Sequence, residues 1–367
     1  LFDFALGYND GVQLPSGASA GYKFELFLKD LIGTGAAISS LNFDELPTPY
    51  RATATDLETG ELQVFSTGEL PRIMRASMSL PGVIAPTEID GRVYVDGGLV
   101  RNLPVDIARN LCGEVIIAVN LGTKPKSRQD IKSSIDVAVQ SLVLLTEQNV
   151  SRSIEALSAD DILIVPDLEE FTSSDFSRQQ EIIERGVRAA MDSKDMLAKL
   201  AVTPDEYQAW LSSRQNKVPD QINVKTITIE ATGEANAEAV QRDIKTRPGE
   251  EFDTEQLNRD LAHIFGRGDF SYVGYSIIPD EENANIVIRA ESKPWGPGYL
   301  KFGFGAATDF TSPAQINMAA SYRRTWINSL GAEWRTDIQL GYDSLLRTSF
   351  IQPMQVRDGA FIMPYAE

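Results

Sequence analysis

Hydrophobic and polar positions follow three different rhythms along the chain, and each rhythm predicts a different kind of structure. Within residues 1–215, short apolar runs at 115–119 and 161–166 alternate with stretches of helical spacing such as 131–154. A continuous run rich in β-branched residues is typical of a strand buried on both faces. Strands that alternate with helices indicate a mainly parallel sheet. We therefore expect an α/β fold over residues 1–215.

The second rhythm belongs to a compact stretch over residues 220–293, which follows a polar linker ending in Pro219. Two amphipathic helical patterns stand between patterns that predict strands. The expected elements are, in order, a strand from Val224, helices over 236–244 and 254–265, and strands over 272–279 and 284–291. The order β-α-α-β-β predicts a small α+β domain.

From Gly298 onward, apolar and polar residues alternate with a period of two, most clearly over the thirteen residues 330–342. Ordinary strands have roughly five or six residues. One apolar face and one charged face suit a transmembrane β-barrel strand, which has lipid on one side and a polar lumen on the other. The alternative is an amphipathic strand of a soluble sandwich. We interpret residues 298–367 as the first strands of an antiparallel transmembrane β-barrel. About four or five strands fit there, and closure needs about eight, so this barrel is incomplete.

Charge and length narrow the class of protein. The chain has 52 acidic and 34 basic residues, a formal net charge of -18. This balance argues against nucleic acid as a partner, because phosphate binding needs a concentrated basic face. No run of about 18 apolar residues occurs, so we expect no transmembrane helix. Neither the start at Leu1 nor the end at Glu367 carries a recognisable signal, and we expect a fragment cut at both ends.

The chain has one cysteine and one histidine, and their scarcity limits the possible chemistry. Cys112 alone allows neither an internal disulfide nor a cysteine metal cluster, and we expect it to be a small buried thiol. His263 falls on the apolar side of a predicted helix. A Ser-His-Asp triad within the chain would have to use it, and a His-rich zinc site is excluded.

A short strand over 92–95 leads into Asp96, which two glycines, Gly97 and Gly98, follow directly. The glycines allow a tight turn and a close approach to the carboxylate. Asn102 and Pro104 then have the pattern of a helix start. A carboxylate held in this way could accept the proton of a serine hydroxyl. The alternative is a turn whose aspartate only bonds its own backbone.

Four segments, 54–61, 77–86, 96–98 and 102–105, together resemble the patatin-like phospholipase family in order and spacing. The resemblance covers roughly residues 1–200. It implies a three-layer α/β sandwich and a lipid acyl hydrolase of the phospholipase A type, acting on phospholipids or other fatty-acyl esters without a cofactor or metal. It also implies that Asp96 is the partner of a Ser-Asp dyad that uses no histidine. Asp56 lies in another family motif, and we interpret it as a residue that organises a hairpin.

The family nucleophile lies in a Gly-x-Ser-x-Gly elbow, and the chain has one such match, Gly17-Ala18-Ser19-Ala20-Gly21. An elbow needs a hydrophobic strand that leads straight into the serine. Here the preceding residues read as a loop containing Pro15, the spacing to Asp96 is too short, and no glycine-rich oxyanion segment precedes it. We therefore expect the nucleophile to lie outside this chain, with Ser19 as the alternative.

Other polar residues have simpler interpretations. Ser77 and Ser79 lack flanking glycines and are expected to be helix-surface or packing residues. An acidic group lacks the spacing of a calcium-binding loop and is interpreted as a solvated surface, so no metal site is predicted. Its members are Asp167, Glu169, Glu170 and Asp175.

Residues 220–293 resemble a polypeptide-transport-associated (POTRA) domain, with Arg247-Pro248-Gly249 and then Phe252 as the matching stretch. A patatin domain, a POTRA domain and a barrel together resemble the patatin-like autotransporters of type V secretion. This layout implies a bacterial outer membrane, contacted through the barrel, with the hydrolase secreted or at the cell surface. The competing hypothesis is an outer-membrane transport or assembly protein whose N-terminal domain is inert.

Overall fold

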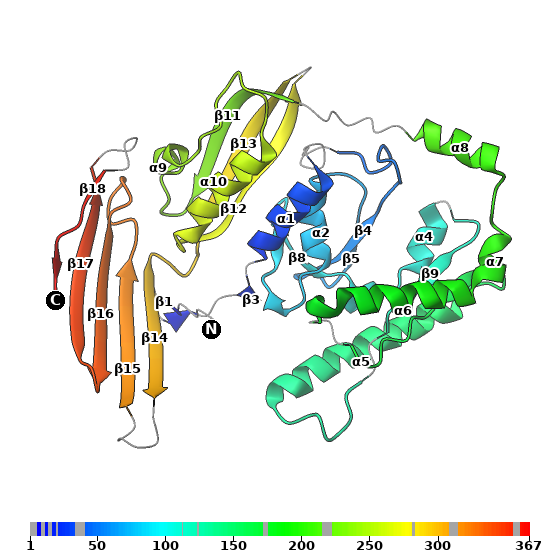
Figure 1. Ribbon diagram of the computed structural model, residues 1–367, viewed down its shortest axis with the longest axis horizontal. Coiled ribbons are helices and arrows are strands. Elements are labelled where there is room, and N and C mark those ends of the chain that lie inside the picture. The colour runs from blue at the N-terminus through cyan, green and yellow to red at the C-terminus, as the bar shows by residue number, and fades with distance from the viewer. Residues whose placement is uncertain are drawn as a thin grey trace.

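The computed structural model describes most of the chain and arranges it as three neighbouring parts (Figure 1). A helix-rich α/β part lies on the right of the view, a small α+β unit at the upper centre, and an antiparallel sheet on the left. The predicted burial of Cys112 lies outside the described residues. These are 6–8, 12–13, 17–19, 21–33, 41–111, 113–122, 125–171, 175–214, 222–280, 283–307, 315–354 and 360–367.

The first part alternates helices and short strands, as the sequence predicts. Its strands are β3 (Gly17–Ser19), β4 (Ala52–Asp56), β5 (Leu62–Phe65), β6 (Gly82–Ile84), β7 (Thr87–Ile89), β8 (Arg92–Asp96), β9 (Ile117–Val119) and β10 (Ile162–Ile164). Its helices are α1 (Tyr22–Ile32), α2 (Leu70–Ser77), α3 (Gly98–Arg101), α4 (Val105–Leu111), α5 (Ser134–Glu155), the 3-10 turn η2 (Phe176–Arg178), α6 (Gln179–Asp192), α7 (Lys194–Ala198) and α8 (Pro204–Ser213).

The prediction of a mainly parallel sheet is wrong for the strands around Asp96. The sheet β5-β4-β8-β7 is antiparallel throughout, because tight turns join β4 to β5 and β7 to β8. Parallel pairing is confined to β9 with β10 and β3 with β6. Strand β9 is also not buried on both faces, since Ile117 and Val119 are about half exposed while Ala118 is buried.

Capping boxes begin two of the described helices. Ser133 accepts a hydrogen bond from the N–H of Asp136, and the Asp136 carboxylate accepts one from the N–H of Ser133, so α5 begins with a capping box. Thr203 and Glu206 form the same motif at the start of α8, with Thr203 as the N-cap and Pro204 as the first helical residue. The helix expected after Pro104 is α4, but α3 already begins at Gly98, before Asn102.

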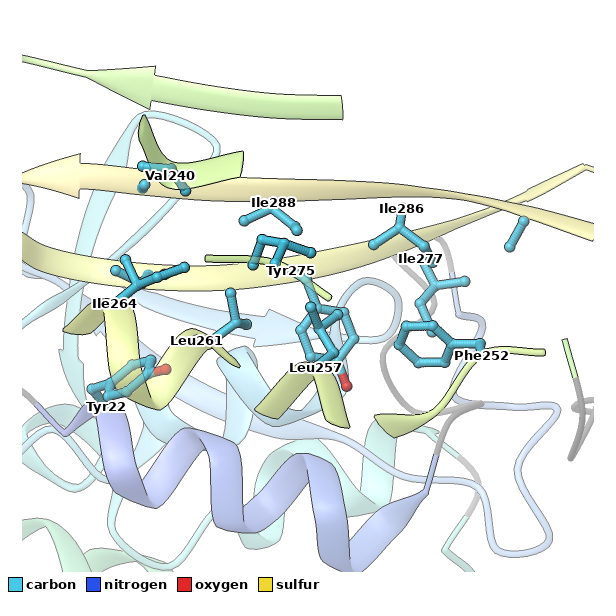
Figure 2. Packing of buried hydrophobic residues seen from close by; sticks show 14 of the residues in the cluster. Tyr22, Val240, Phe252, Leu257, Leu261, Ile264, Tyr275, Ile277, Ile286 and Ile288 are labelled. Carbon is cyan, nitrogen blue, oxygen red and sulfur yellow. The ribbon is translucent and has the colours of Figure 1, made fainter. Parts of the chain in front are cut away.

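The small unit has the predicted order: β11 (Asn223–Thr232), α9 (Ala237–Arg242), α10 (Thr254–Gly266), β12 (Phe270–Asp280) and β13 (Asn283–Ser292). Strand β13 lies in the centre of the sheet, parallel to β11 and antiparallel to β12. Figure 2 shows Leu257, Leu261 and Ile264 of α10 packed beneath this sheet. The prediction for His263 is wrong, because its side chain is exposed.

The third part is an antiparallel meander of long strands. Its members are β14 (Gly298–Ala307), β15 (Gln315–Arg324), β16 (Glu333–Gly341) and β17 (Leu345–Pro353), with the short β18 (Phe361–Ile362) and β19 (Tyr365–Ala366) beside β17. On the opposite edge, β1 (Leu6–Tyr8) pairs with β14 and β2 (Val12–Gln13) pairs with β1. Among the described residues this sheet is open.

The alternating pattern over 330–342 overestimates the length of β16. The strand begins only at Glu333, because the N–H of Gly331 bonds the carbonyl of Asn328 and the N–H of Ile327 bonds that of Ala332. Within the meander the predicted two faces do form. Phe302 pairs with Ala320, Ala320 with Ile338 and Ile338 with Leu346, so apolar side chains share one face in a row.

Candidate functional site around Asp96

Asp96 ends β8, and backbone contacts fix it on two sides. Its N–H donates to the carbonyl of Ser79 over 3.0 Å. Its own carbonyl accepts a hydrogen bond of 2.9 Å from the Thr55 hydroxyl on the neighbouring strand β4. The main chain at this carboxylate is therefore held by two segments that are distant in sequence.

Each of the two glycines after Asp96 leaves no room for a side chain, and the neighbouring atoms differ between them. A Cβ atom at Gly97 would lie 2.5 Å from the carbonyl oxygen of Thr53, so β4 can pass close to the turn only because position 97 lacks a side chain. A Cβ atom at Gly98 would lie 3.0 Å from Oδ1 of Asp96. Gly98 starts α3, and its N–H donates to that same oxygen over 2.7 Å.

The carboxylate of Asp96 is suited to proton transfer. Burial raises the pKa of the Asp96 carboxyl above its ordinary value, and the N–H of Gly98 opposes this rise only in part. A raised pKa makes a carboxylate a stronger base. Oδ1 already accepts the N–H of Gly98, and Oδ2 accepts no hydrogen bond from the described residues, so Oδ2 is the better placed oxygen to take a proton.

Helix α5 supports the far side of this turn through Asn149, which is almost fully buried. Its side-chain amide donates to the carbonyl of Gly98 over 3.0 Å, and its Oδ1 accepts from the N–H of Asn102 over 2.9 Å. Asn149 was not among the residues predicted from the sequence. The available signal was a polar residue next to the apolar stripe of a long amphipathic helix.

The serines near the motif differ in environment. The side chain of Ser79 is buried, and its Oγ donates to the carbonyl of Arg75 over 2.9 Å and lies 3.2 Å from Oγ1 of Thr87. Ser79 is therefore a packing residue, as predicted. Ser77 is the last residue of α2 and is partly exposed.

Ser19 is the last residue of a short strand. Gly17–Ser19 form β3, and α1 begins at Tyr22 after Gly21 in a left-handed conformation (φ 68°). Strand β3 pairs in parallel with β6, with Ser19 opposite Ile84. The segment 79–84 thus contacts the strand of Ser19 at Ile84 and the strand of Asp96 at Ser79.

Asp56 organises its hairpin, as predicted. Its Oδ1 accepts hydrogen bonds from the N–H groups of Glu58 and Thr59, and its Oδ2 accepts one from Arg92. The N–H of Thr59, together with that of Glu58 and the Arg92 guanidinium, holds the pKa of the Asp56 carboxyl below its ordinary value. An ionised, occupied carboxylate of this kind is a structural group.

The acidic group in the first part is paired with arginines. Arg185 contacts Asp167 and Glu170, and Arg178 contacts Glu170. Both acidic side chains are at least half exposed. These contacts fit the predicted solvated surface.

Comparison with known proteins points to one family. Residues 8–109 match the family model described as patatin-like phospholipase, and this stretch includes Asp96, Gly97 and Gly98. Residues 8–109 are therefore similar to patatin-like phospholipases. An "uncharacterized NTE family protein" of Mycobacterium tuberculosis is 37% identical over 109 residues, which cover 29% of each chain. The patatin-like phospholipase domain-containing protein 7 of Mus musculus is 37% identical over 103 residues, 26% of this chain and 8% of that protein.

The patatin-like match therefore spans less than a third of the length of these curated relatives. Two solved structures share weaker likeness. BamA from Haemophilus ducreyi lacking POTRA domains 1-3 gives a TM-score of 0.31 at 14% identity, covering 39% of this chain and 27% of that one. POTRA1-3 of Omp85 from Anabaena gives 0.19 at 13% identity, covering 64% and 84%. Both scores are too low to show a shared overall fold.

Within the described residues, no helix has both the length and the apolar character that crossing a membrane requires.

Proposed function

We propose that the protein containing this chain is a lipid acyl hydrolase of the phospholipase A type, with Asp96 as the proton acceptor of a Ser-Asp dyad. The observation that carries this proposal is the Asp96 carboxyl at the end of β8, where backbone contacts with Ser79 and Thr55 fix the main chain and burial partly withdraws the carboxyl from water. The patatin-like stretch supports fatty-acyl esters of phospholipids, or related esters, as substrates. This chemistry requires no cofactor.

The reaction has two steps. A serine oxygen attacks the ester carbonyl while its proton moves to Oδ2 of Asp96, and the tetrahedral intermediate then expels the alcohol, which recovers that proton. Water next attacks the acyl-serine and loses its proton to Asp96, and the second tetrahedral intermediate releases the fatty acid while the serine oxygen recovers that proton. Backbone amides would hold the negative charge on the oxyanion in both steps.

We propose that the attacking serine lies outside these 367 residues, with Ser19 as the alternative. Both can be tested with a serine-directed fluorophosphonate probe. We expect no specific labelling of this chain. Labelling that is lost in Ser19→Ala, and kept in Ser16→Ala, would instead make Ser19 the nucleophile.

The central test is the full-length protein with Asp96→Asn. Loss of the proton acceptor should lower kcat for a phospholipid ester by about 10²–10⁴-fold, the usual contribution of a general base. Asp90→Asn is the matched control, because Asp90 is an exposed turn residue on the other end of the same strand. Full esterase activity of Asp96→Asn would remove Asp96 from the dyad.

We further propose a division into a hydrolase domain (1–215), a POTRA domain (220–293) and the start of an outer-membrane β-barrel (298–367). The hydrolase would then be secreted or held at the cell surface. The β-α-α-β-β order and the apolar face of β14 to β17 support this layout. Transport or assembly of polypeptides at the outer membrane is the second candidate function, and that exposed apolar face favours it. Unchanged esterase activity in Asp96→Asn would favour this second candidate function over hydrolysis.

A further inference from the structure

Four charged side chains lie buried between α1 and α2: Glu25, Lys29, Glu69 and Arg75, none more than 8% exposed. The ammonium of Lys29 lies 2.7 Å from Oε1 of Glu69 and 3.5 Å from Oε1 of Glu25. The guanidinium of Arg75 lies 3.4 Å from Oε2 of Glu25. Two acids and two bases therefore neutralise one another in a place that water does not reach.

The small α+β unit completes this group from the other side. From β12, the hydroxyl of Tyr272 donates to Glu25 over 2.9 Å, and that of Ser276 donates to Glu69 over 2.7 Å. Lys29 in turn donates to the carbonyl of Tyr275 over 2.8 Å. Buried charges are tolerated only when their remaining hydrogen bonds are made, so the charged group depends on β12.

The electrostatics agree with this dependence. Burial alone would raise the pKa of Glu25, but the charges of Lys29 and Arg75 and the Tyr272 hydroxyl outweigh it, and the pKa of Glu25 is lowered. The carboxylate is therefore ionised, and it uses both oxygens for its partners.

Helix α2 links the charged group to the candidate site through hydrogen bonds. Arg75, in the charged group, accepts a hydrogen bond on its carbonyl from the Ser79 hydroxyl, and the carbonyl of Ser79 accepts the N–H of Asp96. Ser79 is fully buried, and α2 packs against both β4 and β8. A short run of direct contacts thus joins Tyr272 of one unit to Asp96 of the other.

The close packing leaves little freedom for a shift at this point. A Cβ atom at Gly21 would lie 2.8 Å from Nε of Arg75 and 2.9 Å from Ile84. Packed cores respond to displacement by discrete rearrangement and not by gradual yielding. Displacement of Arg75 would therefore move Ser79 and the turn that holds Asp96.

We propose that docking of the α+β unit on α1 and α2 positions Asp96, with Lys29, Glu25 and Tyr272 as positioning residues. The inference rests on the proposed function only in treating Asp96 as the base. The hydrolase site is then in its working geometry when the two units are joined, and separation of the units loosens it.

Hydrogen–deuterium exchange of this chain, followed by mass spectrometry over peptides 77–98, tests the coupling. Lys29→Met keeps the length of the side chain and removes its charge. We expect it to speed exchange at the amides of Asp96 and Gly98 by about tenfold or more. Tyr272→Phe removes a single hydroxyl and should act in the same direction with a smaller effect.

Tyr22→Phe is the matched control. Tyr22 stacks on Phe265 across the same contact at 4.1 Å, but its hydroxyl has no hydrogen-bond partner in the part of the chain that the structure describes. It should leave exchange over 77–98 unchanged. Unchanged exchange in a folded Lys29→Met, or in Tyr272→Phe if Lys29→Met does not fold, would overturn the inference, as would an equal increase in Tyr22→Phe.

A kinetic measurement on the full-length protein separates positioning from general destabilisation. Because Asp96 acts on the bond-making step, Tyr272→Phe should lower kcat and leave KM nearly unchanged. If Asp96→Asn retains activity, the proposed dyad fails, while the exchange experiment still decides whether β12 controls the turn. If Asp96→Asn is inactive and Tyr272→Phe has wild-type kcat, the positioning role fails and the dyad stands.

Discussion

Gly97 lies so close to Thr53 that its lack of a side chain is a structural requirement. A methyl group at this position would lie 2.5 Å from the Thr53 carbonyl and 2.6 Å from its hydroxyl. We expect Gly97→Ala to lower the free energy of unfolding by about 1–3 kcal/mol, the usual effect of overpacking. Urea unfolding measures the change. Gly186→Ala in α6, where a Cβ atom meets nothing within 4 Å, should be neutral or stabilising by less than about 1 kcal/mol, and equal effects would contradict the close approach.

The raised pKa of Asp96 predicts a pH-dependent effect of its removal. A group whose folded pKa lies above its unfolded value disfavours folding at pH values above the folded pKa, because the charged form is better solvated in the unfolded chain. Asp96→Asn should therefore raise the unfolding temperature near pH 7, and the gain should vanish as the pH falls below the ordinary value of 3.8. Melting curves from pH 3 to pH 8 test this. A gain that persists at pH 3 would point to a cause other than the carboxylate charge.

Among the elements, helix α10 shows that the apolar positions in the helical pattern over 254–265 face the core of the small unit. Leu261 is fully buried, whereas the nearby His263 is exposed. We expect Leu261→Ala to cost about 2–5 kcal/mol in urea unfolding, because it leaves a cavity. His263→Ala should change stability by less than about 0.5 kcal/mol. A similar loss from both variants would contradict the orientation of α10.

The apolar face of the meander makes a prediction for β16. Ile338 lies in the row formed with Ala320 and Leu346, and the next residue, Gln339, points to the opposite face. Flotation with phosphatidylcholine vesicles measures binding of the chain to lipid. If this face contacts lipid, Ile338→Arg should weaken binding by more than about tenfold. The reason is that an arginine on the lipid face costs about 2–4 kcal/mol at the middle of the bilayer. Gln339→Arg should not weaken binding, and equal effects would remove the membrane assignment.

The elements that the sequence predicts well are those with a local cause. The strands over 272–279 and 284–291 follow from their apolar pattern, and the helices of the small unit follow from periodicity and from caps at Asn236 and Asp253. The errors arise where contacts with residues distant in sequence determine burial or the length of a strand. Strand β9 has a half-exposed face although its sequence is continuously apolar, and the turn after Asn328 shortens β16. Residue patterns do not record which surface is covered or where pairing stops.

At the scale of the molecule, the same distinction applies to the candidate site. Asp96 could be proposed as a candidate from the sequence because its strand and its glycines are adjacent to it in the chain. The residues that hydrogen-bond Asp96 and its turn could not be predicted in this way, because each belongs to another part of the chain. They are Thr55, Ser79 and Asn149. Glu25 and Lys29 have the i, i+4 spacing of an ordinary exposed ion pair, and only the docking of β12 buries them.

The core itself joins units that are far apart in the chain. One hydrophobic cluster contains Tyr22, Phe43 and Ile73 together with Leu257 and Ile288. Strand β1 also pairs with β14 of the meander. Because these contacts join residues on both sides of the stretch between residues 214 and 222, we expect the parts to stay together without a continuous backbone there.

A protease site inserted between residues 214 and 222 tests this arrangement. After cleavage we expect the pieces 1–214 and 222–367 to elute together in size-exclusion chromatography. In Lys29→Met, the cut pieces should separate at concentrations where the cut parent stays joined. Removing one member of a buried charged group costs about 3–5 kcal/mol, which weakens association by more than about 100-fold. His263→Ala is the control and should elute with the parent. Separation of the unsubstituted cut chain would show that the shared cluster does not hold the two units.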